Sequence, residues 1–349
     1  MPRVAIVLFN LGGPDSLETI RPFLFNLFND PAIISKPRLV RWILAKLISA
    51  CRARTARSIY DCIGGRSPLV AETEAQARAL EAALRSPSLE MKVFPAMRYW
   101  HPFISDVAWT VKQWCPDQVV LLPLYPQFSS TTTASSLAEW SRTAAGLEAE
   151  TTAVCCWPVQ PDWVAAVTDL TRQGLEATRR TGVVHDRLPR VLFSAHGLPE
   201  CVVARGDPYQ HQVEETAAAV IAALREPDLD YRVCYQSRIG LQRWIGPETR
   251  DMIREAGTSR VPVVLVPVTF VSEHVETLVE LDIEYRRVAK VAGVPAYIRV
   301  PTTRVHPRFI TGLARLVQEA LTCEKSDPCS QWSKYNCLSS TFRCTTRAA

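Results

Sequence analysis

The chain has 349 residues, of which 47% are hydrophobic, and its formal net charge is +5. This length predicts two domains, and the hydrophobic content excludes disorder for most of the chain. The charge is too small and too dispersed to indicate nucleic-acid binding. No segment approaches the roughly 18 uninterrupted apolar residues of a spanning helix, and the N-terminus lacks the long apolar region of a signal peptide. We therefore expect a cytoplasmic protein that contacts a membrane only peripherally.

Eight short runs rich in β-branched residues alternate with amphipathic segments. Several runs are apolar on consecutive residues, which is typical of strands buried on both faces of a parallel sheet. The predicted strands are Arg3–Phe9, Met91–Met97, Gln118–Leu124, Thr152–Cys155, Arg190–Ala195, Tyr231–Gln236, Val261–Val268 and Ala296–Val300. The amphipathic segments include Pro68–Leu84, Pro102–Trp114, Asp207–Leu224 and Ser272–Val291. This rhythm predicts an α/β fold of two Rossmann-like, doubly wound halves, each with a parallel four-stranded sheet.

The boundary between the halves is expected near the polar helical segment 158–188. We assign residues 1–165 to an N-terminal half, residues 166–321 to a C-terminal half and residues 322–349 to a polar, cysteine-bearing tail.

Four predicted strands run into polar or turn-forming residues, at positions 10–14, 123–130, 194–199 and 270–276. Ligands of open parallel sheets bind at the carboxyl ends of the strands, so these segments are candidates for one site. Neither the dinucleotide-binding glycine pattern nor a P-loop is present, which argues against a nucleotide. The turn at Gly12 and Gly13 is interpreted as a close approach of the backbone to a flat ligand.

His196 follows the fifth strand, between small residues and before Gly197. A histidine at such a position is more often structural than catalytic, but the segment that follows the seventh strand favours a functional interpretation. At the α-helical period, Glu273, Glu276, Glu280 and Glu284 would lie on one stripe, with Asp282 opposite. Lys and Arg are absent from positions 272–285, unlike on an ordinary solvated face. A carboxylate stripe beside a histidine suits capture of a divalent metal or removal of protons.

Several sequence segments together resemble the ferrochelatase family over roughly residues 5–317. They are LFNLGGP, IGGRSPL, MRYWHP, LPLYPQFSSTTTASS, LFSAHGLP, RGDPY, YQSRIG, WIGPET and SEHVETLVELDIEY, in that order. The combination of FSAHGLP with HVETLVELDIEY is the most specific feature. The resemblance implies a chelatase-type fold that holds a porphyrin between two Rossmann-like halves.

Residue roles follow from the same resemblance. His196 matches the essential histidine, Glu276 the carboxylate across the pocket from it, and His274 and Glu280 neighbours on the acidic helix. The implied porphyrin-binding residues are Leu11, Arg98, Tyr99, Tyr125, Trp244 and Phe270. The family's metal site pairs His196 with Glu276, so these two residues are the candidate Fe²⁺ ligands.

The implied reaction is insertion of Fe²⁺ into protoporphyrin IX, the last step of haem biosynthesis, with release of two protons. His196 would accept a proton, and Glu276 and Glu280 would carry protons or iron. Some relatives that use coproporphyrin have a tyrosine at the position of Leu11, so this apolar residue favours protoporphyrin. The alternatives are a chelatase for coproporphyrin or another metal, a non-catalytic haem- or porphyrin-binding protein and a substrate-binding transport protein.

Residues 23–60 combine large apolar side chains with basic ones, among them Trp42, Leu47, Arg38 and Lys46. This composition suits the surface of an anionic membrane, although an ordinary amphipathic core helix explains it equally well. In the family the segment forms the lip of the pocket, so we predict peripheral membrane association.

Four of the eleven cysteines fall in the tail, and such clustering can hold zinc or an iron–sulfur centre. Some ferrochelatases carry a [2Fe–2S] cluster on three C-terminal cysteines and a distant one. The distant cysteine of animal members falls at Ser130 here, and Cys155 or Cys156 is the candidate substitute. The candidate cluster ligands are Cys323, Cys329, Cys337, Cys344, Cys155 and Cys156. A tail of free thiols is the alternative, and the tail is also a candidate support for a homodimer.

Overall fold

The computed structural model describes residues 1–181, 188–238 and 242–322. The chain forms two compact units. The first contains Met1–Trp157 together with Leu313 and the described residues after it, and the second contains Pro158–Gly312. The assignment of domains to residues 1–165, 166–321 and 322–349 stays a prediction.

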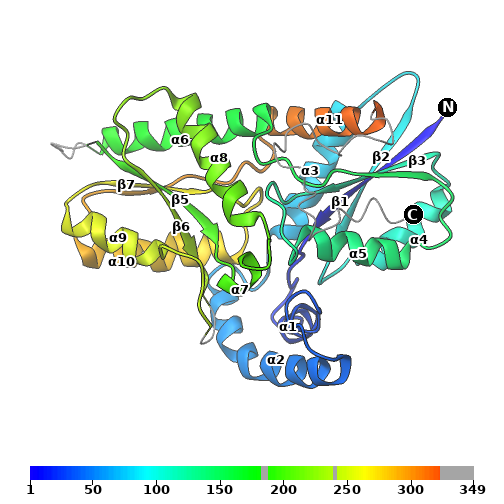
Figure 1. The fold of residues 1–349 in the computed structure, drawn as a ribbon, viewed down its shortest axis with the longest axis horizontal. Helices are drawn as coiled ribbons and strands as arrows, with labels where there is room; N and C mark the ends of the chain where they lie inside the picture. The colour runs from blue at the N-terminus through cyan, green and yellow to red at the C-terminus, as the bar shows by residue number, and fades with distance from the viewer. Residues whose placement is uncertain (182–187, 239–241, 323–349) are drawn as a thin grey trace. The chain divides into compact units, whose positions relative to one another are not determined.

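The sheet of the first unit has four parallel strands in the order β2-β1-β3-β4 (Figure 1). The strands are β1 (Arg3–Asn10), β2 (Glu90–Met97), β3 (Gln118–Pro123) and β4 (Glu150–Ala153). In β1, every residue from Val4 to Asn10 is buried, because helices cover both faces of the sheet. Ala5, Val7 and Phe9 pack into the core on the side of two helices, α4 (Ile104–Trp114) and α5 (Thr133–Thr143).

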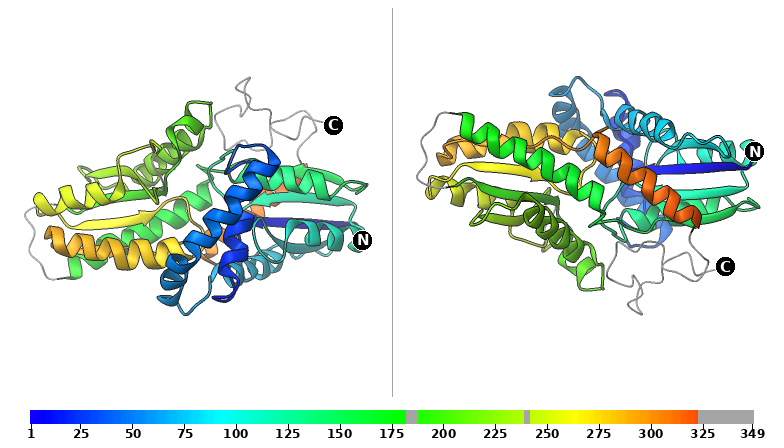
Figure 2. Two further views of the ribbon diagram at one scale, coloured as in Figure 1. Left: turned by 90° about the horizontal axis from the view of Figure 1, so that it is seen from below. Right: turned by 90° about the horizontal axis from the view of Figure 1, so that it is seen from above.

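The opposite face of this sheet carries α3 (Leu69–Ala83), which contacts β1 and β2 (Figure 2). Two further helices, α1 (Ile20–Phe28) and α2 (Arg38–Asp61), follow β1 in the chain and pack against each other. Within the described ranges, no helix is both long and apolar enough to span a bilayer.

The second unit repeats the pattern, with the strand order β6-β5-β7-β8 and parallel pairing throughout. Its strands are β5 (Arg190–His196), β6 (Tyr231–Gln236), β7 (Val263–Pro267) and β8 (Tyr297–Arg299). One face is covered by α6 (Pro161–Arg180) and α8 (Tyr209–Leu224), and the other by α9 (Thr249–Thr258) and α10 (Tyr285–Ala292) (Figure 1). A Cβ atom on Gly174 would lie 2.8 Å from Cγ2 of Val300, so glycine lets α6 approach the sheet closely.

The segment after β7 departs from the predicted single helix. It is irregular up to His274, forms the π-helix η1 (Glu276–Glu284) after a helical Val275 and then continues as α10. The remaining described helices are α7 (Glu200–Val203) and α11 (Pro307–Thr322). The predicted fold class is confirmed: the two parallel four-stranded sheets are present, and all eight predicted strands occur with slightly displaced ends.

Candidate active site

The structure brings His196 and Glu276 into direct contact. His196 is the last residue of β5, Glu276 is the first residue of η1, and Nδ1 of His196 lies 2.9 Å from Oε2 of Glu276. The backbone of His196 is fixed as well, because the Tyr209 hydroxyl donates to its carbonyl at 2.9 Å. The side chains are 36% and 27% exposed, so a ligand can reach both.

His274 and Glu280 belong to the same cluster. Nε2 of His274 lies 3.8 Å from Oε2 of Glu276. Glu280 accepts hydrogen bonds from the Ser237 backbone at 3.0 Å, the Ser237 hydroxyl at 2.5 Å and the Tyr285 hydroxyl at 2.8 Å. The Ser237 hydroxyl is also 3.3 Å from Oε2 of Glu276, so this serine links the two carboxylates.

Ser237 was not identified from the sequence. It follows the carboxyl end of β6, and its φ of 64° puts it in the left-handed region, which costs a non-glycine residue free energy. This conformation directs both its N–H and its hydroxyl to Glu280. Its position directly after a predicted strand could have marked Ser237 as a candidate site residue, but its left-handed backbone conformation could not be predicted from the sequence.

The surroundings of Glu276 and Glu280 shift the pKa values of these two carboxylates in opposite directions. Burial alone would raise the pKa of Glu276, but the charge and hydrogen bond of His196 hold it well below its usual range. Burial raises the pKa of Glu280, and the charge of Glu276 raises it further. Burial would lower the pKa of His196, yet Glu276 raises it above its ordinary value. The cluster therefore combines a histidine–carboxylate ion pair with a second carboxyl group that takes up protons more readily.

The predicted stripe of four glutamates is wrong in part. Glu273 precedes the helix and pairs with Arg299 at 2.7 Å, while Glu284 lies 3.8 Å from Arg250. Asp282, which was expected on the face opposite Glu273, binds the same Arg299. The prediction assumed one continuous α-helix, whereas the π-helix places about one more residue in each turn than the 3.6 of an α-helix.

Phe270 and Trp244 also lie in the second unit, and both are partly buried. The ring of Phe270 is 4.5 Å from that of His274, centroid to centroid. A Cβ atom on Gly197 would lie 2.8 Å from the Gln236 carbonyl oxygen and 3.3 Å from Cε3 of Trp244. Glycine after His196 therefore permits the close approach of these groups.

Arg98 and Tyr99 form a separate polar cluster in the first unit, around the buried side chain of Asp30. Nη2 of Arg98 and the Tyr99 hydroxyl each lie 2.9 Å from Oδ2 of Asp30, and the Ser135 hydroxyl lies 2.5 Å from it. Nε of Arg98 also donates to the Ser135 hydroxyl at 2.8 Å. Asp30 and Ser135 were missed in the sequence because neither follows a strand.

The other predicted residues of the first unit lie in its core. Leu11 packs against Tyr99, and its carbonyl accepts the Tyr99 N–H at 2.9 Å. Tyr125 is buried in the core beside β1, and burial raises the pKa of its hydroxyl. Cys155 and Cys156 are buried next to Phe128. The other candidate cluster ligands, Cys323, Cys329, Cys337 and Cys344, lie outside the described residues.

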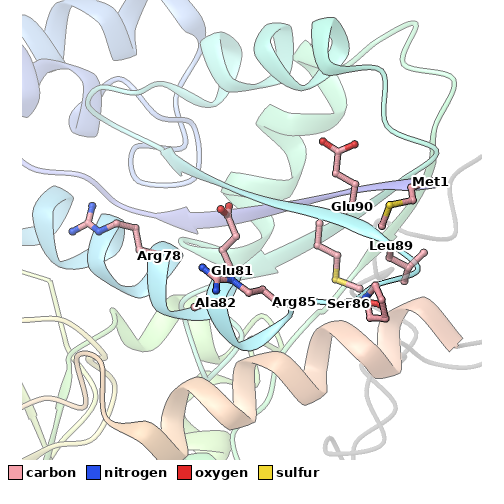
Figure 3. Close-up of a pocket in the computed structure, with 10 residues that line it drawn as sticks. Met1, Arg78, Glu81, Ala82, Arg85, Ser86, Leu89 and Glu90 are labelled. Atoms are coloured by element: carbon pink, nitrogen blue, oxygen red, sulfur yellow. The ribbon is translucent and has the colours of Figure 1, made fainter.

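A cavity of about 810 Å³ opens on the first unit (Figure 3). It lies between the end of α3 and the start of β2, and its lining includes Arg78, Glu81, Arg85 and Glu90. None of the predicted site residues lines it. In the part of the chain that the structure describes, no group of three or more His, Cys, Asp or Glu side chains is arranged to hold a metal ion.

Comparison with solved structures gives the class of the fold. SirB from Bacillus subtilis with Fe³⁺ matches with a TM-score of 0.54 and 11% identity, covering 92% of this chain and 96% of that one. CbiX, described as the terminal enzyme for biosynthesis of siroheme in denitrifying bacteria, matches with a TM-score of 0.50 and 15% identity, covering 92% of this chain and 100% of that one. The fold is therefore of the chelatase type.

Sequence comparison gives the family. The family model described as Ferrochelatase matches residues 3–321. A protein named Ferrochelatase from Caulobacter vibrioides is 53% identical over 322 residues, with 91% of this chain and 90% of the relative covered. Another of that name from Phenylobacterium zucineum is 49% identical over 347 residues, covering 99% and 98%. The chain belongs to the ferrochelatase family.

The contact between His196 and Glu276 predicts how the His196 imidazole titrates in the metal-free protein. Because the Glu276 charge raises the pKa of His196, Glu276→Gln should lower that pKa, and the imidazole should lose its proton at a lower pH. NMR titration of the His196 ring protons measures this shift. Glu284→Gln is the matched control, because Glu284 lies in the same helix but pairs with Arg250. An unchanged His196 titration in Glu276→Gln would contradict the assigned cause.

Proposed function

We propose that this protein inserts Fe²⁺ into protoporphyrin IX to form protohaem, with release of two protons. It is a lyase of the ferrochelatase family, and the observation that carries the chemistry is the ion pair of His196 and Glu276 at 2.9 Å. Leu11 supports protoporphyrin over coproporphyrin as the substrate, because this apolar side chain packs with Tyr99 and offers no polar group.

Metal insertion requires that two pyrrole N–H protons leave the macrocycle as the metal takes the nitrogen lone pairs. An ionised Glu276 only accepts hydrogen bonds, so when the imidazole of His196 is neutral its one hydrogen lies on Nδ1 and Nε2 has a free lone pair. Nε2 accepts a pyrrole proton, and Glu276 stabilises the imidazolium that forms. Glu280, whose pKa is raised, accepts a proton through the Ser237 hydroxyl.

His196 and Glu276 are also the proposed ligands of the incoming iron. Imidazole nitrogen and carboxylate oxygen are suitable donors for Fe²⁺. The short contact joins Nδ1 to Oε2, so iron would bind at Nε2 or Oε1, or would separate the pair. Proton removal and iron delivery therefore compete for the same atoms and must occur in sequence.

The cluster around Asp30 is proposed to bind the porphyrin. Asp30 and Ser135 accept hydrogen bonds from Nη2 and Nε of Arg98 and so hold its guanidinium in one orientation. In this proposal the Nη1 donors of Arg98 bind a carboxylate such as a porphyrin propionate. Within this proposal, Tyr125, Trp244 and Phe270 supply aromatic contacts.

The decisive experiment is anaerobic incubation of the purified protein with protoporphyrin IX and Fe²⁺, followed by the porphyrin absorbance spectrum. Loss of a general base typically costs about a hundredfold or more in rate, so His196→Ala should abolish most of the turnover. His211→Ala is the matched control, because His211 is a half-exposed histidine on α8 that lies 3.7 Å from Glu215.

One outcome would contradict the mechanism, and three would contradict the function. Full turnover by His196→Ala would remove His196 from the mechanism. Binding of porphyrin without insertion of Fe²⁺ would favour a porphyrin-binding protein, and insertion of another metal, or use of coproporphyrin alone, would favour a related chelatase.

Peripheral membrane association is a second part of the proposal. Leu39 and Leu47 on α2 are 71% and 58% exposed, and Trp42 and Ile43 beside them are half-exposed. Basic residues flank them, and the Lys46 ammonium lies 4.9 Å from the Trp42 ring centroid. Apolar side chains surrounded by cations suit the interface of an anionic bilayer. The protein would then be cytoplasmic with its α2 face on the membrane.

Cosedimentation with vesicles that contain phosphatidylglycerol tests this surface. The double variant Leu39→Ser, Leu47→Ser should bind at least about a hundredfold more weakly, because each of the two buried leucines contributes roughly 1.5 kcal/mol or more and every 1.4 kcal/mol is about tenfold in affinity. The control is Val291→Ser, which changes another highly exposed apolar residue. Absence of vesicle binding by the unchanged protein would refute the association.

A [2Fe–2S] cluster on the tail is a further proposal. Cys155 and Cys156 are the candidate ligands among the described residues, and their burial beside Phe128 would shield a cluster from water. The protein purified anaerobically from iron-replete cells should show visible absorbance that Cys155→Ser, Cys156→Ser or truncation after residue 322 removes. A colourless protein would end this proposal.

Sedimentation of the same samples tests the predicted homodimer, with and without the tail.

A further inference from the structure

The π-helix η1 carries the two carboxylates of the site. A π-helix is rare, usually occurs as a single turn inside an α-helix, and is often found at functional sites. Here it extends from Glu276 to Glu284 without interruption. Such a conformation persists only where the surrounding structure holds it. The contacts that hold η1 therefore determine where Glu276 and Glu280 point.

Arg299, the last residue of β8, makes the strongest of these contacts. Its Nη1 donates to Oε1 of Glu273 at 2.7 Å, and its Nε donates to Oδ1 of Asp282 at 3.0 Å. Its Nη2 also donates to Oδ2 of Asp282, so the fork binds this carboxylate with two hydrogen bonds. The Arg299 and Glu273 side chains are 9% and 10% exposed.

In the sequence, the two carboxylates that Arg299 binds lie on either side of Glu276 and Glu280. Glu273 lies before the start of η1, and it accepts the Thr277 hydroxyl at 2.5 Å. Thr277 follows Glu276 directly, so this contact fixes the first turn. Asp282 lies between Glu280 and the end of η1, so the second contact fixes the later part. The Tyr297 hydroxyl, two residues before Arg299, also donates to the Leu281 carbonyl at 2.8 Å.

We propose that Arg299 is a positioning residue, which holds η1 in its π conformation and thereby aims Glu276 at His196 and Glu280 at Ser237. Arg299 touches neither His196 nor the reacting atoms and acts through the helix. Lysine cannot replace it, because a single ammonium group cannot bind two carboxylates with the geometry of the guanidinium fork. The effect on catalysis rests on the proposed function, whereas the effect on η1 does not.

Arg190 provides a matched control. It is the first residue of β5, at the opposite end of that strand from His196, and its side chain is 8% exposed. It also joins two carboxylates, with Nε 2.6 Å from Asp230 and Nη1 2.8 Å from Glu255. Arg190→Lys therefore changes a buried arginine that joins two carboxylates, although these are more exposed, at 32% and 48%, and the change makes no contact with η1.

The test compares Arg299→Lys with Arg190→Lys in the full chain by hydrogen–deuterium exchange and steady-state kinetics with Fe²⁺ and protoporphyrin IX. We expect amides of residues 276–284 to exchange about tenfold faster in Arg299→Lys but not in Arg190→Lys. We also expect kcat of Arg299→Lys to fall about tenfold or more, with KM for porphyrin within about twofold of the unchanged value. Asp282→Asn, at a site 26% exposed, should reproduce both effects more weakly and is the variant to use if Arg299→Lys does not fold.

Equal exchange of η1 in the two lysine variants would overturn the proposal and reduce Arg299 to a general contributor to stability. A fall in kcat/KM that comes from KM alone would also overturn it. If the unchanged protein inserts no iron, the proposed function fails, while the exchange comparison still decides whether Arg299 holds η1.

Discussion

Five carboxylates lie within residues 273–284, and keeping them together in one partly buried place is the constraint on which the site depends. Two like charges 4 Å apart repel by about 4 kcal/mol at the effective dielectric of a protein surface. Each carboxylate is therefore matched by a partner from another element. The partners are Arg299 for Glu273 and Asp282, His196 for Glu276, Ser237 and Tyr285 for Glu280, and Arg250 for Glu284.

The partners differ in charge, and this difference gives the carboxylates different chemistry. Glu276 faces an imidazole that becomes cationic, so its pKa is held low and it stays ionised. Glu280 accepts hydrogen bonds from hydroxyl and amide donors, and its pKa is raised by burial and by the negative charge of Glu276. Titratable neighbours whose environments separate their pKa values are typical of acid–base sites. A cluster that would be merely repulsive on an exposed helix thus contains one carboxylate that stays ionised and one that takes up a proton more readily.

The regular elements could be predicted from the sequence, whereas the pairing of His196 with Glu276 was implied by the family resemblance. The strand runs are apolar and β-branched because helices cover both faces of each sheet, so the placement of His196 at a strand end could be predicted. The residues that pair with the carboxylates could not be predicted from the sequence. The absence of Lys and Arg from residues 272–285 was real, yet Arg299 and Arg250 arrive from other elements. Local spacing contains no information about such long-range pairs, and a π-helix has no distinct sequence period to recognise.

Two unusual local conformations meet at Glu280. Ser237 has a left-handed backbone, and its two donors bind Glu280, a residue of the π-helix. At the other end of β5, Arg190 joins Asp230, in the connection before β6, to Glu255 on α9. Left-handed residues such as Cys115 and Arg304 also occur away from the site. At Ser237, however, this conformation is combined with a π-helix and both of its donors bind one carboxylate, which favours a role of Glu280 in the reaction.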